Sequence, residues 1–321
     1  MEARWDVDFS KFLSDGNCQS EVLESYQQLG FFVFRGVFDE NEISEIRSHV
    51  KWLMQKYPTI RPEHFHHPLM IRDAFWLRVV CKKKILDILE KFLGANIAVF
   101  TSHYICKPAY DGQPVFWHQD ISYWNLDPPE AVSAWLAIDE STPENGCLRV
   151  IPGTHQSATL FGQKVPRLEQ PNLLSSSMED STIQQLIQHK QIIDLVMKPG
   201  DLSIHNPFLV HSSNANTSAR SRYALDTAYI STKTIVKTKN TYQNLFLVKG
   251  TEQNSTNLYT PLPQFVSGET IEFPEWKEWN DGVKIANAQL KNPNTIDVWQ
   301  LAVEDMTKKM IAALQNGTTD C

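Results

Sequence analysis

The sequence predicts a mainly β protein, a barrel or jelly roll with helices on its N-terminal side. From Ile97 onward, apolar residues fall in short β-rich runs that Gly, Pro and Asn interrupt. Before Ile97 they recur every three or four positions, which is typical of amphipathic helices. The 321 residues, 42% of them hydrophobic, suffice to bury a sizeable core. We expect one domain over 1–321, with a helical flank to about 95, a β core over about 96–247 and an extension beyond.

Start and stop signals place the elements of the N-terminal flank. Residues 21–30 form an amphipathic pattern that ends in a glycine, and the apolar run 31–34 follows as a short strand. Asp39 is a suitable N-cap for a helix that continues to about Tyr57. A further amphipathic helix is predicted over about 83–92, where Gly94 stops it.

The β core is predicted from six runs of strand-forming residues. They cover residues 97–106, 131–138, 148–151, 192–197, 201–204 and 222–230. The polar stretch 156–190 is interpreted as an insertion with helical character only around 181–187. The prolines after Val248 predict irregular structure before a C-terminal helix over about 296–314.

Charge and cysteine content exclude several classes of protein. The formal net charge is −7, and the longest basic run is Lys82-Lys83-Lys84, which does not indicate a nucleic-acid partner. Five widely spaced cysteines without a CxxC pair predict reduced thiols rather than a disulfide or zinc scaffold. The acidic N-terminus and the lack of a long apolar window predict a cytoplasmic protein without membrane contact. Nothing in the sequence indicates an oligomeric state.

A candidate metal site is formed by His118, Asp120 and His211. His118 and Asp120 are two positions apart in a strand-like stretch, so a strand would direct both side chains to one face. His211, 93 residues further on, supplies a second imidazole, although His205 competes for that role. Two histidines and one carboxylate on one side of a metal are typical of non-haem Fe(II) oxygenases. In isolation, His118 and Asp120 are also compatible with a hydrogen-bonded surface pair.

Beyond this pattern, the sequence resembles the phytanoyl-CoA dioxygenase family of Fe(II)/2-oxoglutarate-dependent oxygenases. The resemblance rests on Gly30 to Val37, Trp117 to Asp120, Pro143 to His155, Pro199 to His205, His211 and Arg222, in this order. It covers about residues 20–230. The fold that it implies is a double-stranded β-helix (jelly roll, cupin-like) flanked by N-terminal α-helices and a C-terminal helix.

The resemblance implies a role for each site residue. His118, Asp120 and His211 would bind Fe(II), which leaves positions for 2-oxoglutarate and O2. Arg222, eleven residues after His211, would bind the far carboxylate of 2-oxoglutarate through its planar, permanently charged fork. Ser213 would donate its hydroxyl to the same carboxylate. Arg220 shares strand parity with Arg222 and stays open as an alternative.

The resemblance also implies a class of reaction. Related halogenases lack the carboxylate ligand, so Asp120 favours hydroxylation, desaturation or oxidative cyclisation, with 2-oxoglutarate converted to succinate. We expect a small-molecule substrate, as in specialised metabolism. Two alternatives remain open. One is a non-catalytic binding or sensor protein on the same fold, which would usually carry a broken triad or lack the arginine. The other is a peptide hydroxylase.

Aromatic residues near the ligands are candidates for the substrate pocket. They are Tyr104, Phe116, Tyr123, Trp124 and Trp135. Core packing is an alternative role for Trp135 and for Trp117, because large aromatic side chains fill barrel interiors. The cluster His64, His66 and His67 lies in a proline-flanked segment. It is interpreted as a surface loop or active-site lid in preference to a second metal site.

Overall fold

The computed structural model describes residues 4–164, 177–237, 244–291 and 293–294. Within these ranges, no helix combines the length and the apolar character that crossing a membrane requires.

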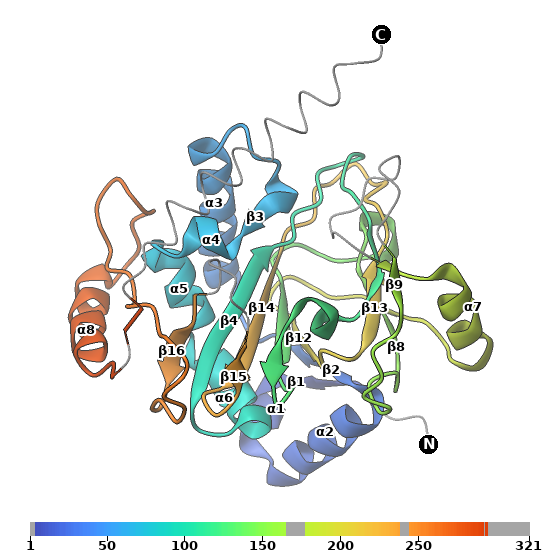
Figure 1. The fold of residues 1–321 in the computed structure, drawn as a ribbon. Coiled ribbons are helices and arrows are strands. Elements are labelled where there is room, and N and C mark those ends of the chain that lie inside the picture. Colours follow the sequence, from blue (N-terminus) through green and yellow to red (C-terminus); the bar gives the residue numbers. More distant parts are fainter. Residues whose placement is uncertain (1–3, 165–176, 238–243, 292, 295–321) are drawn as a thin grey trace.

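The described residues form a mixed but mainly β arrangement (Figure 1). The helices are α1 (Phe9–Ser14), α2 (Gly16–Leu29), α3 (Glu40–Lys56), α4 (His67–Met70), α5 (Ala74–Val80), α6 (Lys83–Leu93), α7 (Asp180–His189) and α8 (Trp276–Ala288). The strands are β1 (Asp6–Asp8), β2 (Phe31–Arg35), β3 (Phe65–His66), β4 (Ile97–Tyr104), β5 (Val115–His118), β6 (Leu126–Asp127), β7 (Val132–Ala137), β8 (Leu148–Ile151), β9 (Gln163–Lys164), β10 (Ser177–Met178), β11 (Ile193–Leu195), β12 (Leu202–His205), β13 (Val210–Ser213), β14 (Ala224–Ser231), β15 (Ile235–Val236) and β16 (Phe246–Lys249).

Two sheets face each other and form the core. The major sheet has the strand order β1-β2-β12-β7-β14-β4-β16, with β3 paired to β4, and the minor sheet has the order β11-β8-β13-β5. Side chains from both sheets pack into one buried cluster, in which Phe31 and Trp135 of the major sheet meet Leu148, Val150 and Leu195 of the minor sheet. This arrangement is the predicted double-stranded β-helix core.

The alternation of side chains along the major sheet separates an inner face from an outer face. On β7, Ala134 and Leu136 belong to the cluster beneath the helices, whereas Trp135 belongs to the cluster between the sheets. On β12, Ile204 faces the helices in the same way, and His205 follows it on the inner face. Because strand residues two apart share a face, the sheet brings alternate residues of β7, β12, β14 and β4 into one interior space.

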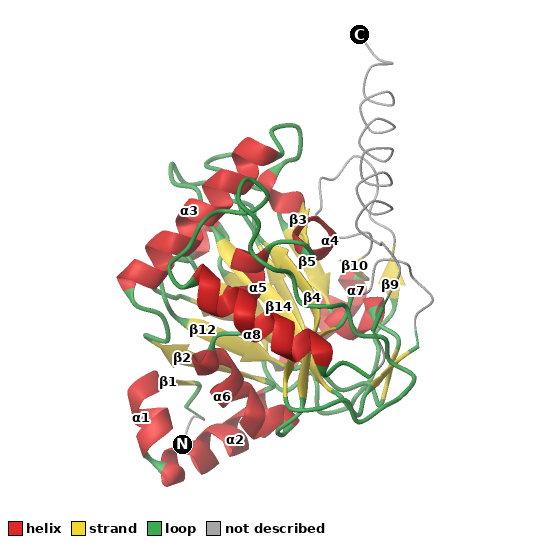
Figure 2. Cartoon of the chain, turned by 90° about the vertical axis from the view of Figure 1, so that its left-hand side faces the viewer, coloured by secondary structure: helices red, strands yellow, loops and turns green. Residues whose placement is uncertain are grey.

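Helices α1 to α6 and α8 cover the outer face of the major sheet (Figure 2), whereas α7 packs against the minor sheet through Ile183. Asp39 caps α3 with a full capping box, since its side chain accepts from the Glu42 amide and the Glu42 side chain accepts from the Asp39 amide. Gly30 ends α2 in the left-handed conformation, as predicted from the glycine. Capping residues thus set the bounds of these helices, and their apolar faces pack against the major sheet.

The C-terminal part differs from the prediction. Helix α8 begins at Trp276 within the stretch that we expected to be irregular, and the expected helix over about 296–314 lies outside the described residues. Helix α5 was also missed, because six of its seven residues are buried and its sequence therefore lacks a polar face.

Gly200 shapes the turn that leads into β12. Its φ is +91°, and a Cβ at this position would collide with the carbonyl oxygen of Phe38. We therefore expect Gly200→Ala to lower the free energy of unfolding by at least about 1–3 kcal/mol. Gly282→Ala is the matched control, because Gly282 lies within α8 with no atom near its would-be Cβ, and it should be neutral or stabilising. Chemical denaturation of both variants tests this; equal stability would contradict the strain argument.

Candidate functional site

His118 and His211 lie side by side on neighbouring strands of the minor sheet. His118 ends β5, His211 lies on β13, and the two residues are direct partners in the antiparallel register. Their ring centroids are 4.0 Å apart, and both residues are 5% exposed. The pairing of β5 with β13 thus brings together two histidines that are far apart in the sequence.

Asp120 joins the two histidines by a route that differs from the one expected. Strand β5 ends at His118, and Asp120 begins a short 3-10 helix. Gln119 nevertheless keeps extended dihedral angles (φ −122°, ψ 129°), so the alternation of side chains continues one residue past the strand. The Gln119 amide points away from the site and bonds to the backbone of Thr159, Phe161 and Phe208. These bonds hold the backbone of residues 118–120 in place from the side opposite the candidate ligands.

The candidate ligand atoms converge on one oxygen of Asp120. The Nε2 atoms of His118 and His211 each lie 3.4 Å from Oδ1 of Asp120. Among the described residues, His118, Asp120 and His211 are the one group of three or more such side chains whose donor atoms all lie within 4.8 Å of one another. Two imidazoles and a carboxylate on one side of a small space are the donor set of a facial Fe(II) site.

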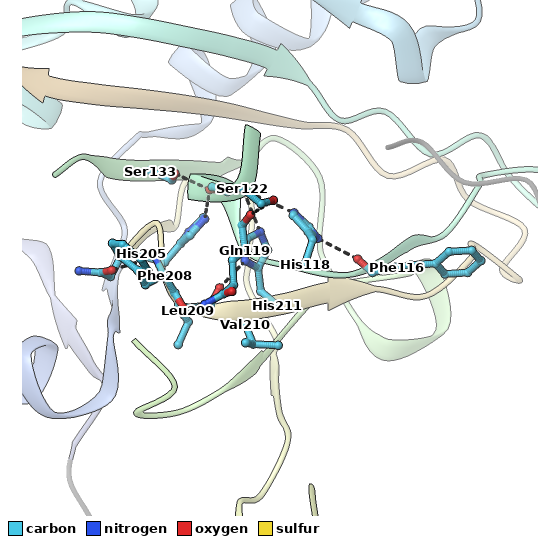
Figure 3. A network of polar contacts seen from close by, with 12 residues as sticks. Phe116, His118, Gln119, Ser122, Ser133, His205, Phe208, Leu209, Val210 and His211 are labelled. Atoms are coloured by element: carbon cyan, nitrogen blue, oxygen red, sulfur yellow. Dashed lines mark hydrogen bonds and ion pairs between the residues drawn. The ribbon is translucent and has the colours of Figure 1, made fainter. Parts of the chain in front are cut away.

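Backbone carbonyls fix the orientation of both imidazole rings. Nδ1 of His118 donates to the carbonyl oxygen of Phe116 at 2.8 Å (Figure 3), and Nδ1 of His211 donates to that of Leu209 at 3.0 Å. These bonds place the proton on Nδ1 and leave the Nε2 lone pair free for a metal. The chain therefore presents the two rings in the tautomer that a metal ligand needs.

The second oxygen of Asp120 is held by residues of the major sheet. The hydroxyl of Ser133 donates to Oδ2 at 2.8 Å, and Nε2 of His205 lies 3.2 Å from the same atom. His205 thus contacts the oxygen opposite the one that His118 and His211 face. This placement makes His205 a positioning residue for Asp120, and it favours His211 over His205 as the second histidine ligand.

Electrostatics keep the carboxylate ionised within a buried site. Burial alone would raise the pKa of Asp120, but His211, His118 and His205 hold it well below its usual range. Burial lowers the pKa of His118 and of His205, with His211 adding to the effect. Burial alone would lower the pKa of His211, but the charge of Asp120 raises it above its usual value. An anionic carboxylate beside imidazoles is a state that attracts a divalent cation.

The bond from Ser133 predicts an effect on metal affinity. Ser133→Ala should weaken Fe(II) binding by about 10–100-fold, because Asp120 loses a donor that orients it. Ser203 offers a matched control, since it is a buried serine of the adjacent strand β12 whose hydroxyl has no hydrogen-bond partner among the described residues. Metal titration of both variants checks this. Equal loss in both would attribute the effect to packing instead of orientation.

A cavity of about 310 Å³ opens beside the candidate ligands, between the two sheets. Arg222 lines it and is 1% exposed. Its guanidinium lies 5.3 Å from the centre of the Trp135 ring and donates to the carbonyl oxygens of Gly146 (2.8 Å) and Ile105 (3.3 Å). No carboxylate of the described residues lies within ion-pair distance of Arg222, and its Nε has no hydrogen-bond partner.

A buried cation without a counter-ion is costly unless a ligand supplies the anion. Burial lowers the pKa of Arg222 to about 10, so the side chain is still charged at neutral pH. Arg220, the alternative, is 70% exposed at its side chain and pairs with Glu140 at 3.2 Å on the surface. Ser213 lines the same cavity as Arg222, although a register shift between His211 and Ser213 interrupts the pairing of β13 with β5.

The aromatic candidates divide into two groups. Tyr123, Trp124 and Trp135 line the cavity, and Trp135 also belongs to the cluster between the sheets. Tyr104 points the other way, fully buried beneath the helices, where its hydroxyl bonds to His49 at 2.8 Å. Phe116 contributes its carbonyl, and its ring points away from His118 (Figure 3). Tyr104 and Phe116, which we expected as pocket candidates, are thus not among the residues that line this cavity.

The histidine-rich segment contributes one residue to the cavity. His66 lines it and forms a hydrogen bond with the ring of His103 on β4. His67 is buried between Trp76 and Phe246, and His64 lies outside the cavity lining. No second metal cluster is present among the described residues.

Among the polar residues of the cavity wall that sequence reasoning missed, three lie on β4 and β14. They are Thr101, His103 and Asp226. Asp226 follows Arg222 by four positions, and strand parity would have placed both on one face of the strand predicted over 222–230. No motif marks these residues, because their position follows from the pairing of β14 with β4.

The chain matches proteins of one family. The family described as phytanoyl-CoA dioxygenase (PhyH) matches residues 26–224. Phytanoyl-CoA dioxygenase 1 of Oryza sativa subsp. japonica is 35% identical over 159 residues, a match that covers 46% of this chain and 54% of that protein. The peroxisomal phytanoyl-CoA dioxygenase of Homo sapiens is 26% identical over 237 residues, which cover 66% and 68%. The chain thus spans about half of the rice relative and about two thirds of the human one.

Solved structures show the same fold. The non-heme monooxygenase ThoJ in its apo form aligns with a TM-score of 0.60 at 18% identity, covering 91% of this chain and 98% of that chain. EctD from Sphingopyxis alaskensis with bound Fe aligns with a TM-score of 0.53 at 16% identity, covering 78% and 80%. At these identities the likeness supports the architecture of two facing sheets with flanking helices.

Proposed function

The chain belongs to the phytanoyl-CoA dioxygenase family, and from this premise we propose that it is an Fe(II)/2-oxoglutarate-dependent dioxygenase acting on a small molecule. The observation that carries the proposal is the juxtaposition of two unlike features in one cavity. One is the group His118, Asp120 and His211, and the other is the buried guanidinium of Arg222, which has no ion-pair partner among the described residues. The first fits a divalent metal and the second fits a carboxylate.

Each residue has a defined task in this proposal. His118 and His211 would hold Fe(II) through Nε2, and Asp120 through Oδ1. Ser133 and His205 keep Oδ2 of Asp120 in place, so the carboxylate does not turn away from the ion. Arg222 and Ser213 would bind the far carboxylate of 2-oxoglutarate. When bound, Fe(II) supplies the redox chemistry by which O2 oxidises 2-oxoglutarate to succinate and CO2 and oxidises a substrate C–H bond.

The walls of the cavity support a small-molecule substrate. Its volume of about 310 Å³ lies at the lower end of the range for ligand pockets. Trp124, Trp135 and Leu148 form apolar walls, which exclude water from the reacting atoms. We propose a role in specialised metabolism, with hydroxylation, desaturation or cyclisation decided by where the substrate carbon lies relative to the metal.

Succinate release tests this function. Purified protein is supplied with Fe(II), 2-oxoglutarate and O2, with and without pools of small molecules and, separately, pools of peptides. The proposal expects slow succinate formation alone and a rise with members of the small-molecule pool. The absence of 2-oxoglutarate binding and of succinate under all conditions would overturn it, and stimulation by peptides alone would assign a peptide hydroxylase.

A further inference from the structure

Asp226 is a carboxylate of the cavity wall that the proposed chemistry does not use. It lies on β14 opposite His103 of β4 and Trp135 of β7, and it lines the cavity together with the candidate metal ligands. Its Oδ1 is buried and has no hydrogen-bond partner among the described residues. A buried carboxylate oxygen without a donor is costly, so its presence in a ligand cavity points to a donor on the ligand.

The charges around Asp226 leave it without a counter-ion. Nearby ionisable groups are Asp120, which repels it, and His211, which attracts it but faces Asp120. No cationic side chain of the described residues lies within ion-pair distance of Asp226. Burial and the charge of Asp120 raise the pKa of Asp226 to about 8, so the carboxyl group is largely protonated at neutral pH until a cation lies beside it.

With Fe(II) and 2-oxoglutarate bound, as the proposed function on which this inference rests requires, the other charges of the cavity balance. The charges of Fe(II) and Arg222 offset those of Asp120 and of the two carboxylates of 2-oxoglutarate. Asp226 is then the remaining acidic group of the cavity, and it ionises when a cation binds beside it. Because His66 and His103 are bonded to each other and burial lowers the pKa of His103 to about 4, these rings are neutral and do not balance it.

We propose that Asp226 binds a cationic nitrogen of the substrate, so that the substrate class is a small amine or amino-acid-like molecule. Tyr123 and Trp124 line the same cavity, and aromatic rings beside a ligand also favour a cation. Asp226 lies near Asp120 and His211. A nitrogen held there would place the neighbouring carbons of the substrate near the metal.

Binding of matched probe pairs tests the proposal without knowledge of the natural substrate. The pairs share a carbon skeleton and differ in one group: cyclohexylamine with cyclohexanol, and phenethylamine with 2-phenylethanol. Each probe is titrated under anaerobic conditions against protein loaded with Fe(II) and 2-oxoglutarate, and the shift in melting temperature gives the affinity. The variant is Asp226→Asn, which keeps the shape and removes the charge. Asp281→Asn is the control, because Asp281 lies on α8 with a 76% exposed side chain.

We expect each amine to bind at least about tenfold more tightly than its alcohol to the wild type and to Asp281→Asn. In Asp226→Asn this preference should disappear. Failure of every amine to bind, or a preference that survives in Asp226→Asn, would overturn the proposal. Equal affinity of amine and alcohol in the wild type would assign Asp226 to neutral hydrogen bonding and also overturn the cationic class.

Binding of 2-oxoglutarate is measured first, in the wild type and in both variants, and it separates this inference from the proposed function. If the wild type does not bind 2-oxoglutarate, the proposed function fails, and the charge argument built on it fails too. If all three proteins bind 2-oxoglutarate equally and no amine preference is found, only the role of Asp226 is refuted.

Discussion

Replacing His211 with Ala is expected to weaken Fe(II) binding by more than about 100-fold and to abolish succinate formation. Loss of a residue that only orients a ligand costs about 10–100-fold, and His211 supplies a ligand atom itself. Its Nε2 faces Oδ1 of Asp120 at 3.4 Å, so the substitution leaves one imidazole and a carboxylate. Titration with Fe(II) under anaerobic conditions gives the affinity, and succinate formation gives the activity.

The control for this variant is His189→Ala. His189 is the last residue of α7 and is exposed, so metal affinity should stay at the wild-type value. The melting temperature of each metal-free variant shows whether it is folded. A folded His211→Ala protein that binds Fe(II) as tightly as the wild type would exclude His211 as a ligand.

Replacing Arg222 with Met should weaken 2-oxoglutarate binding by at least about 30-fold. Removal of one partner of a buried charge pair costs about 2–5 kcal/mol, and Arg222 is the buried cation of the cavity without a protein counter-ion among the described residues. Arg222→Lys should bind 2-oxoglutarate with an affinity between those of the wild type and Arg222→Met, because an ammonium keeps the charge but loses the bidentate fork. Fe(II) affinity should change little, since Arg222 does not contact the metal group.

Arg220→Met is the matched control, because the same substitution then falls on a surface arginine that pairs with Glu140. The apparent dissociation constant for 2-oxoglutarate is measured for all three variants on metal-loaded protein. Equal affinity in Arg222→Met and Arg220→Met would remove Arg222 from the cosubstrate site.

Local rules predicted the elements that local interactions control. The helix over Glu40–Lys56 follows from the cap at Asp39, and the end of α2 follows from Gly30. Helix α5 escaped prediction because it is buried on most sides, which removes the amphipathic period that marks a helix. Helix α8 lies after Pro274 in a stretch rich in charged and aromatic residues. Its apolar pattern is weak, and the prolines before it led us to predict irregular structure.

The metal group could be predicted because its residue types and order are distinctive. We expected a continuous strand to align His118 and Asp120. This was only partly right, because the strand ends at His118 and Gln119 alone continues the extended geometry. The groups that hold Asp120 could not be predicted. Ser133 and His205 reach it from β7 and β12, and their approach depends on how the major sheet faces the minor one. Asp226 was missed because no motif marks it, although its strand parity with Arg222 could have pointed to it.

The absorption spectrum of the protein with Fe(II) and 2-oxoglutarate under anaerobic conditions tests directly whether the metal and the cosubstrate share one site. Chelation of Fe(II) by a 2-oxo acid within the site predicts a visible charge-transfer band that requires both components. The band should be absent in His211→Ala and should need far more 2-oxoglutarate in Arg222→Met. A folded wild-type protein that shows no band at saturating Fe(II) and 2-oxoglutarate, or a band that both substitutions leave unchanged, would contradict the account.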